Sequence, residues 1–190
     1  DYQVYWGTSS PVSNGSQKLG YTSNVESFHG GVSPGSRYYY RVAARNATGQ
    51  EGPLSDEMSV LVPAQSNLVP YDPPPSGWSY SIVVSTTPGS HIPATAGQRI
   101  GGRYYYVGYN VRNTGLGSAG AFNVYIYVNG QYKDSYYFGS LGSNQSATGE
   151  NYIYFPSGSN TIKIDIDPQN YVGESNESDN SLQTVPITWQ

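Results

Sequence analysis

Hydrophobic and polar residues alternate along much of the chain with the period of two that is typical of β-strands. The pattern is clearest in residues 121–128, where Phe122, Val124, Ile126 and Val128 occupy every second position. We expect these four side chains to face a core. The chain shows no sustained period of 3.6 residues, which would indicate an amphipathic helix. The pattern therefore predicts an all-β protein.

The predicted strands fall into two groups on either side of a proline-rich segment. Residues 64–77 contain four prolines and no apolar period, so we expect a semi-rigid linker there. Residues 1–63 precede it, and residues 78–190 follow it with seven candidate strands. These strands span roughly residues 79–86, 103–113, 121–128, 131–138, 147–155, 161–167 and 181–189. Seven short strands joined by turns predict a β-sandwich.

The first group contains the sequence VSPGSRYYYRVAARN. Its V-x-P-G-x-x-Y segment resembles the turn into the sixth strand of a fibronectin type III domain, with Tyr38 at the tyrosine-corner position. The resemblance implies that the Tyr38 hydroxyl bonds to the backbone a few residues upstream. Residues 1–63 are fewer than the roughly 100 of a complete sandwich of this kind. We therefore expect a sandwich whose first strands are missing, in a chain that is a piece of a longer protein.

The second group contains YNVRNTGLGSAGAFNVYIYVNG and, near its end, IKIDIDPQNYVGESNESDNSL. These stretches resemble the CARDB family, the cell-adhesion-related domain, over nearly all of residues 78–190. The resemblance implies an immunoglobulin-like sandwich of the kind found in secreted and surface-anchored multidomain proteins. The predicted fold is thus two tandem immunoglobulin-like or fibronectin III-like β-sandwiches, the first incomplete at its N-terminus.

Composition and charge exclude several function classes. The net charge is −4 and the chain has no basic cluster, so we expect no nucleic-acid partner. The absence of cysteine excludes a thiolate nucleophile and a Cys-ligated zinc. No apolar run approaches the length of a membrane span. Residues 31–35 and 115–120 match the enzyme patterns G-x-S-x-G and G-x-G-x-x-G, but each leads into a predicted strand instead of the required helix. We expect no enzyme.

Five of the thirteen acidic residues lie between Asp165 and Asp179. Calcium binds six to eight oxygen ligands, but Pro168 interrupts the spacing of an EF-hand loop counted from Asp165. One hypothesis is a structural corner in which short polar side chains bond to nearby backbone. The alternative is a calcium site without the EF-hand pattern. Its candidate ligands are Asp167, Asn170, Glu174, Glu177 and Asp179. No other cofactor is expected.

Tyrosine is unusually frequent, with twenty residues against four Phe and three Trp. Tyr104 and Tyr106 alternate with the apolar positions of one strand, and Tyr125 and Tyr127 with those of another, so all four should point outward. Exposed tyrosines can stack on sugar rings or contact a protein partner. Tyrosine is also simply a good strand former. The sequence leaves these three interpretations open.

Four N-x-S/T sequons fit glycosylated surface loops, with acceptors at Asn14, Asn46, Asn144 and Asn176. Together these features indicate a non-catalytic adhesive, spacer or structural module of a larger extracellular or cell-surface protein. The expected partners are other protein chains or neighbouring domains, including copies that assemble into a fibre by β-strand addition, and glycans. The alternative function is a carbohydrate-binding accessory region of a secreted hydrolase.

Overall fold

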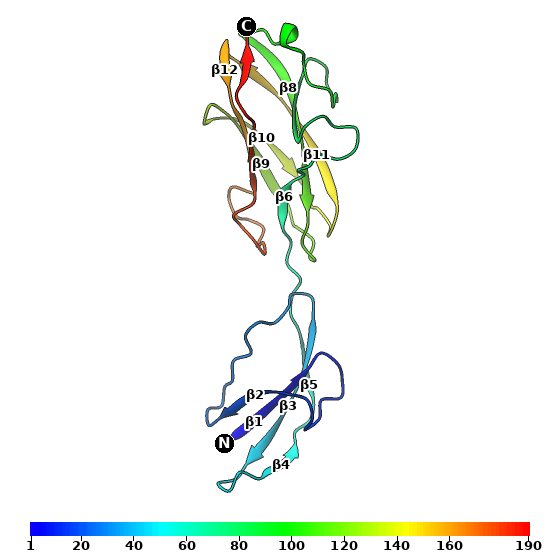
Figure 1. Ribbon diagram of the computed structural model, residues 1–190, viewed down its shortest axis with the longest axis vertical. Helices are drawn as coiled ribbons and strands as arrows, with labels where there is room; N and C mark the ends of the chain where they lie inside the picture. The colour runs from blue at the N-terminus through cyan, green and yellow to red at the C-terminus, as the bar shows by residue number, and fades with distance from the viewer. The chain divides into compact units, whose positions relative to one another are not determined.

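The computed structural model describes residues 1–190, which form two compact units, Asp1–Ala64 and Gln65–Gln190 (Figure 1). Every regular element is a strand except one turn of 3-10 helix, η1 (Ala96–Gln98). No helix has the length and apolar character needed to cross a membrane. The predicted all-β fold is confirmed.

The first unit is a single antiparallel sheet with the strand order β2-β1-β3-β4, in which β5 also pairs with β3. Its strands are β1 (Tyr2–Gly7), β2 (Gln17–Thr22), β3 (Arg37–Arg45), β4 (Glu51–Leu54) and β5 (Met58–Leu61). Its buried core is small and consists of Tyr5, Val12 and Ala43, against which Tyr39 and Leu54 pack. The first unit is thus a single layer of strands.

Tyr38 of β3 is buried, and its hydroxyl accepts a hydrogen bond of 2.9 Å from the backbone N–H of Ser33. This is the upstream backbone bond that the tyrosine-corner resemblance implied. The bond holds the turn of residues 33–36 against the start of β3.

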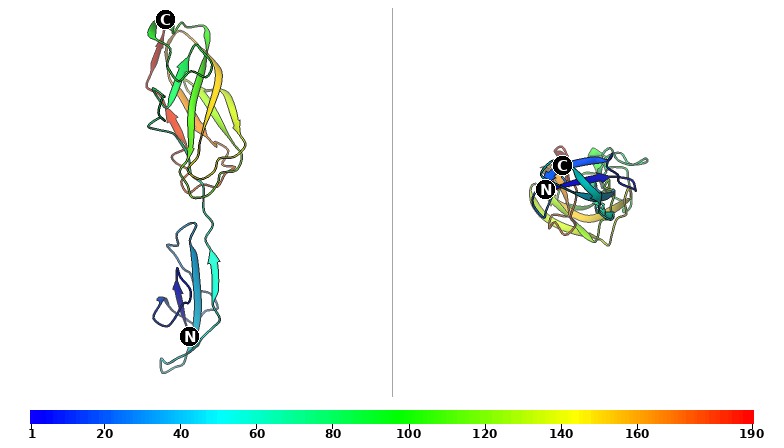
Figure 2. Two further views of the ribbon diagram at one scale, coloured as in Figure 1. Left: turned by 90° about the vertical axis from the view of Figure 1, so that its right-hand side faces the viewer. Right: turned by 90° about the horizontal axis from the view of Figure 1, so that it is seen from below.

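The second unit contains two sheets that face each other (Figure 2). One sheet has the order β10-β9-β13-β14. The other has the order β11-β8-β6, with β7 also paired to β8, and a short pair joins β12 to β15. The strands are β6 (Leu68–Pro70), β7 (Ile82–Ser85), β8 (Arg103–Asn113), β9 (Phe122–Val128), β10 (Gln131–Phe138), β11 (Ser146–Phe155), β12 (Gly158–Asn160), β13 (Ile162–Ile166), β14 (Ser181–Gln183) and β15 (Ile187–Trp189).

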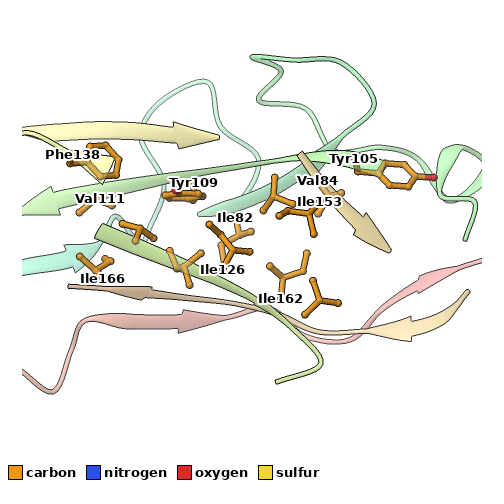
Figure 3. Packing of buried hydrophobic residues seen from close by; sticks show 14 of the residues in the cluster. Ile82, Val84, Tyr105, Tyr109, Val111, Ile126, Phe138, Ile153, Ile162 and Ile166 are labelled. Atoms are coloured by element: carbon orange, nitrogen blue, oxygen red, sulfur yellow. The ribbon is translucent and has the colours of Figure 1, made fainter. Parts of the chain in front are cut away.

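The core of the second unit lies between these sheets (Figure 3). Tyr109 and Val111 of β8 point toward Ile126 of β9 and Ile166 of β13. The four alternating residues of β9 named above are at most 2% exposed, so their predicted inward orientation is confirmed. Burial of an isoleucine such as Ile166 contributes about 1.5 to 3 kcal/mol to folding. A core of this size accounts for a stable sandwich without disulfides.

The proline-rich segment differs from the expected linker. Within residues 64–77, β6 pairs antiparallel with the end of β8, with Leu68 opposite Asn113. Leu68 is fully buried in the core of the second unit. A strand of three residues is too short to show an alternating pattern. Its position depends instead on side chains from the end of the chain.

Candidate functional site

The acidic corner comprises residues 167–180, where the chain leaves β13 and turns back into β14. Asp167 lies directly after β13, is 1% exposed and has a φ of 46°, in the left-handed region that Asp tolerates better than most residues. Its carboxylate accepts hydrogen bonds from the backbone N–H groups of Tyr171 (3.2 Å) and Val172 (2.8 Å). The backbone N–H of Asn170 donates to the Asp167 carbonyl (2.9 Å). Asp167 thus closes the turn with its own side chain.

Glu174 connects the acidic corner to β6. Its buried carboxylate accepts hydrogen bonds from the backbone N–H of Leu68 and from Asn180 Nδ2 (2.8 Å). Burial raises the pKa of Glu174 to about 7, although both hydrogen bonds act to lower it. The backbone N–H of Glu174 donates to Glu177 Oε1 at 2.8 Å. Glu174 therefore links β6, at the start of the second unit, to the acidic corner, which lies more than 100 residues later in the sequence.

Asn67 adds side-chain contacts to this connection. Its Nδ2 donates to Asp179 Oδ2 (3.2 Å), and its Oδ1 accepts a bond from Ser175 Oγ (3.2 Å). The backbone N–H of Ser175 also donates to the Ser66 carbonyl at 2.9 Å. These bonds join residues 66–68 to the second half of the corner, residues 174–179.

The five predicted calcium ligands do not fit a calcium site as a set. Asp167 and Glu174 use their carboxylate oxygens for hydrogen bonds within the protein. Asp179 Oδ1 and the neighbouring Asn180 Oδ1 are buried and have no hydrogen-bond partner. Two such oxygens fall far short of the six to eight that calcium takes. No group of three or more His, Asp or Glu side chains is placed to hold a metal ion.

The glycine-rich stretch of residues 115–120 packs against the same segment. The fully buried side chain of Asn113 accepts hydrogen bonds from the backbone N–H groups of Asn67 and Gly115, each at 3.0 Å. A Cβ on Gly115 would lie 2.4 Å from the Ser66 carbonyl carbon. The first glycine therefore permits a close approach between two backbone segments.

The four predicted surface tyrosines do not form one site. Tyr104 and Tyr106 lie on β8, whereas Tyr125 and Tyr127 lie on β9 in the opposite sheet. Each pair faces outward from its own sheet, because the alternating residues between them are buried. Two further outward tyrosines, Tyr152 and Tyr154, lie beside the β8 pair on β11. Sequence reasoning missed them, although they alternate with the apolar residues of ENYIYF.

The four sequon asparagines, Asn14, Asn46, Asn144 and Asn176, are all exposed and lie outside the strands. Two of them also stabilise their own turns. Asn46 Oδ1 accepts a hydrogen bond from the backbone N–H of Thr48, and Asn176 Oδ1 accepts one from the backbone N–H of Ser178, each at 3.1 Å. The side chains of these two asparagines are therefore accessible but are held by local hydrogen bonds.

A groove of about 680 Å³ lies at one side of the second unit, lined by residues of β7, β14 and β15. Apolar side chains such as Ile82, Leu182 and Ile187 form much of its wall. Asp72 is the only carboxylate in the lining, and its Oδ1 accepts a hydrogen bond from Ser81 Oγ at 2.7 Å. Glycoside hydrolysis uses a pair of carboxylates. The groove does not supply that pair.

Comparisons with known proteins match the second unit to one family. The family model CARDB matches residues 84–184, which are 101 of the 190 residues. No curated protein sequence matches the chain. Among solved structures, the CARDB domain of the PF1109 protein from Pyrococcus furiosus, in complex with di-metal ions, is 16% identical with a TM-score of 0.46. That match covers 65% of this chain and 93% of the other.

A second solved structure is a domain of a Methanosarcina acetivorans protein that is provisionally described as a cell surface protein. It is 22% identical with a TM-score of 0.45, and the match covers 66% of this chain and 93% of the other. The family match spans more than half of the chain, from β7 into the segment after β14. The chain therefore belongs to the CARDB family.

Proposed function

We propose that this chain is a non-catalytic segment of an extracellular or cell-surface protein, in which the CARDB sandwich serves as an adhesive or structural module. The observation that carries the proposal is the match of the CARDB family model to residues 84–184. The acidic corner supports its structural part. Its buried carboxylates, on Asp167 and Glu174, accept hydrogen bonds from backbone N–H groups and so hold the fold together. Exposed asparagines in the four sequons are consistent with a glycosylated outer surface.

Calcium is not required for this role. The acidic corner is held by the protein's own donors: backbone N–H groups and the Asn180 amide donate hydrogen bonds to the carboxylates of Asp167 and Glu174. The corner then connects β13 to β14, and its acidic residues stabilise the fold.

The first unit is the C-terminal part of a fibronectin type III-like domain, supported by the Ser33–Tyr38 hydrogen bond. Its sheet exposes apolar side chains on one face, around a groove of about 640 Å³. Met58 is 71% and Val60 48% exposed on this face, beside Val4 and Val42. Exposed apolar surface of this kind marks an interaction site. Strands from a second copy of the chain cover this face, which makes the protein a subunit of a larger assembly.

Sedimentation velocity over a wide concentration range tests the assembly. We expect concentration-dependent association that Val60→Lys weakens at least tenfold, because it places a charge on the apolar face. Leu61→Lys is the matched control: Leu61 is 52% exposed on the same strand, but neighbouring strand residues point to opposite faces. A wild-type chain that stays monomeric at every concentration, or equal effects of the two variants, would contradict the assembly.

A second candidate function is a carbohydrate-binding accessory region of a secreted hydrolase. The observation that favours it is the group of exposed tyrosines on β8 and β11. An adjoining catalytic domain in the parent protein would support it.

A further inference from the structure

Four tyrosines form a continuous row on the outer face of the second unit. The antiparallel register of β8 and β11 places Tyr104 opposite Tyr154 and Tyr106 opposite Tyr152. Tyr104 and Tyr152 are each 56% exposed. Figure 1 shows the two strands running side by side. The residues between these tyrosines point into the core, so the row is a fixed part of the sheet surface.

The rings of the row contact one another in sequence. The ring centroids of Tyr106 and Tyr152 are 4.7 Å apart, and those of Tyr152 and Tyr104 are 5.1 Å apart with an interplanar angle of 24°. The ring centroids of Tyr104 and Tyr154 are 5.5 Å apart. Tyr152 and Tyr104 are thus the two inner rings of the row, because each touches two neighbours. Contacts between rings restrict their rotamers, which lowers the entropy lost when a ligand binds.

Trp78 extends the row along β8. Two positions beyond Tyr106, Gly108 has no side chain, and a Cβ there would lie 3.3 Å from the Trp78 ring. Trp78 also stacks on His91, with centroids 4.2 Å apart and an interplanar angle of 20°. The row and Trp78 together form an aromatic strip. From Tyr104 to Gly108 this strip is roughly 13 Å long, at about 3.3 Å per residue. The strip is long, narrow and aromatic.

The electrostatic surroundings of the strip are nearly neutral. Glu150 lies opposite Gly108, and its Oε1 accepts the backbone N–H of Gly89 at 2.8 Å. The strip has no cluster of Lys or Arg, whereas single-stranded nucleic acid requires a positive groove beside its stacking rings. Protein interfaces typically involve 20 to 30 residues on each side, far more than this row provides. The chemistry favours a narrow, uncharged ligand with flat apolar faces.

We infer that the row of Tyr104, Tyr106, Tyr152 and Tyr154 binds a neutral polysaccharide. A pyranose ring presents a face of C–H groups that packs on an aromatic ring, and its hydroxyl groups lie at the edge, within reach of tyrosine hydroxyls. A chain of such rings lies along the strip with successive sugars over successive tyrosines. This inference supplies the ligand class for the second candidate function, and it does not depend on self-association of the first unit.

Native electrophoresis of the whole chain in gels that contain soluble neutral polysaccharides tests the inference. The panel is hydroxyethyl cellulose, glucomannan, xyloglucan, laminarin and soluble starch. We expect at least one polysaccharide to retard the wild-type chain. Tyr152→Ala should weaken that affinity at least tenfold, and Tyr152→Phe should retain most of it because the ring remains. Tyr104→Ala, at an equally exposed position, serves as a second variant should Tyr152→Ala fold poorly.

The matched control is Tyr132→Ala on the other sheet. Tyr132 is 53% exposed and contacts both Tyr125 and Tyr127, with centroids 5.2 and 6.0 Å apart. This change should leave polysaccharide binding intact, and circular dichroism melts should show all variants folded. Failure of every polysaccharide to retard the wild-type chain would overturn the inference, as would an equal loss in Tyr132→Ala and Tyr152→Ala. Neither result would bear on the proposed self-association of the first unit.

Discussion

Replacing Asp167 with alanine is expected to lower the free energy of unfolding of the second unit by about 3 to 5 kcal/mol. The change leaves the backbone N–H groups of Tyr171 and Val172 without their acceptor, at about 1 to 3 kcal/mol each. It also places alanine at a φ of 46°, which costs about 1 kcal/mol more than for a residue that tolerates the left-handed region. Urea unfolding followed by circular dichroism measures the loss.

Asp165 provides the matched control two residues earlier. Its side chain points away from the core and pairs with Lys163 at 2.7 Å on the partly exposed face of β13. Surface ion pairs contribute about 0.2 to 1 kcal/mol. Asp165→Ala should therefore change stability by no more than about 1 kcal/mol. Equal effects of the two substitutions would show that the corner does not depend on the Asp167 carboxylate.

Gly115→Ala is expected to destabilise the second unit by about 2 to 4 kcal/mol, through overpacking and weakened hydrogen bonds. The added Cβ would lie within 2.5 Å of backbone atoms of residues 65–67, which cannot rotate away as a side chain can. Moving that segment would also strain the 2.8 Å bond from the Gly117 N–H to the Gln65 carbonyl. Urea unfolding again gives the measurement.

Gly120→Ala tests whether this effect is local. Gly120 is the last glycine of the same pattern, and a Cβ there would meet nothing within 4 Å. The expected change is within about 0.5 kcal/mol. A large loss of stability in Gly120→Ala, or no loss in Gly115→Ala, would show that these glycines do not act through close backbone contact.

Alternation of apolar residues made most of the second unit predictable. The expected strand of residues 103–113 coincides with β8, and Ile162, Ile164 and Ile166 are buried as their spacing indicates. Strand β6 was not predictable, because three residues among prolines carry no period. Its place in the sheet depends on a bond from the Leu68 N–H to Glu174, which lies 106 residues later.

The candidate site was predictable only in part. The alternation of Ile162, Ile164 and Ile166 is enough to place Asp165 on the outer face, where it lies, but the sequence offers no means of knowing that Asp167 is buried. That burial follows from tertiary packing around the turn, and the side chain is tolerated there because backbone N–H groups satisfy it. The tyrosines of β8 and β9 could not be assigned to separate faces either, because alternation orients a residue within its sheet but does not say which sheets are neighbours.

The raised pKa of Glu174 has a defined consequence for stability. A folded-state value of about 7, above the ordinary 4.5, means that the folded chain binds the proton more tightly than the unfolded chain. This contribution to stability is full below pH 4.5 and is lost as the pH rises toward 7. A calcium ion on Glu174 would favour the charged carboxylate and lower the pKa instead.

An NMR titration of the Glu174 side-chain carboxyl carbon, in chelator and in excess calcium, therefore tests most directly whether hydrogen bonds alone hold the acidic corner. The predicted midpoint lies near pH 7 and is the same in both solutions. A midpoint that falls below the ordinary 4.5 when calcium is added would contradict this account and identify the corner as a metal site.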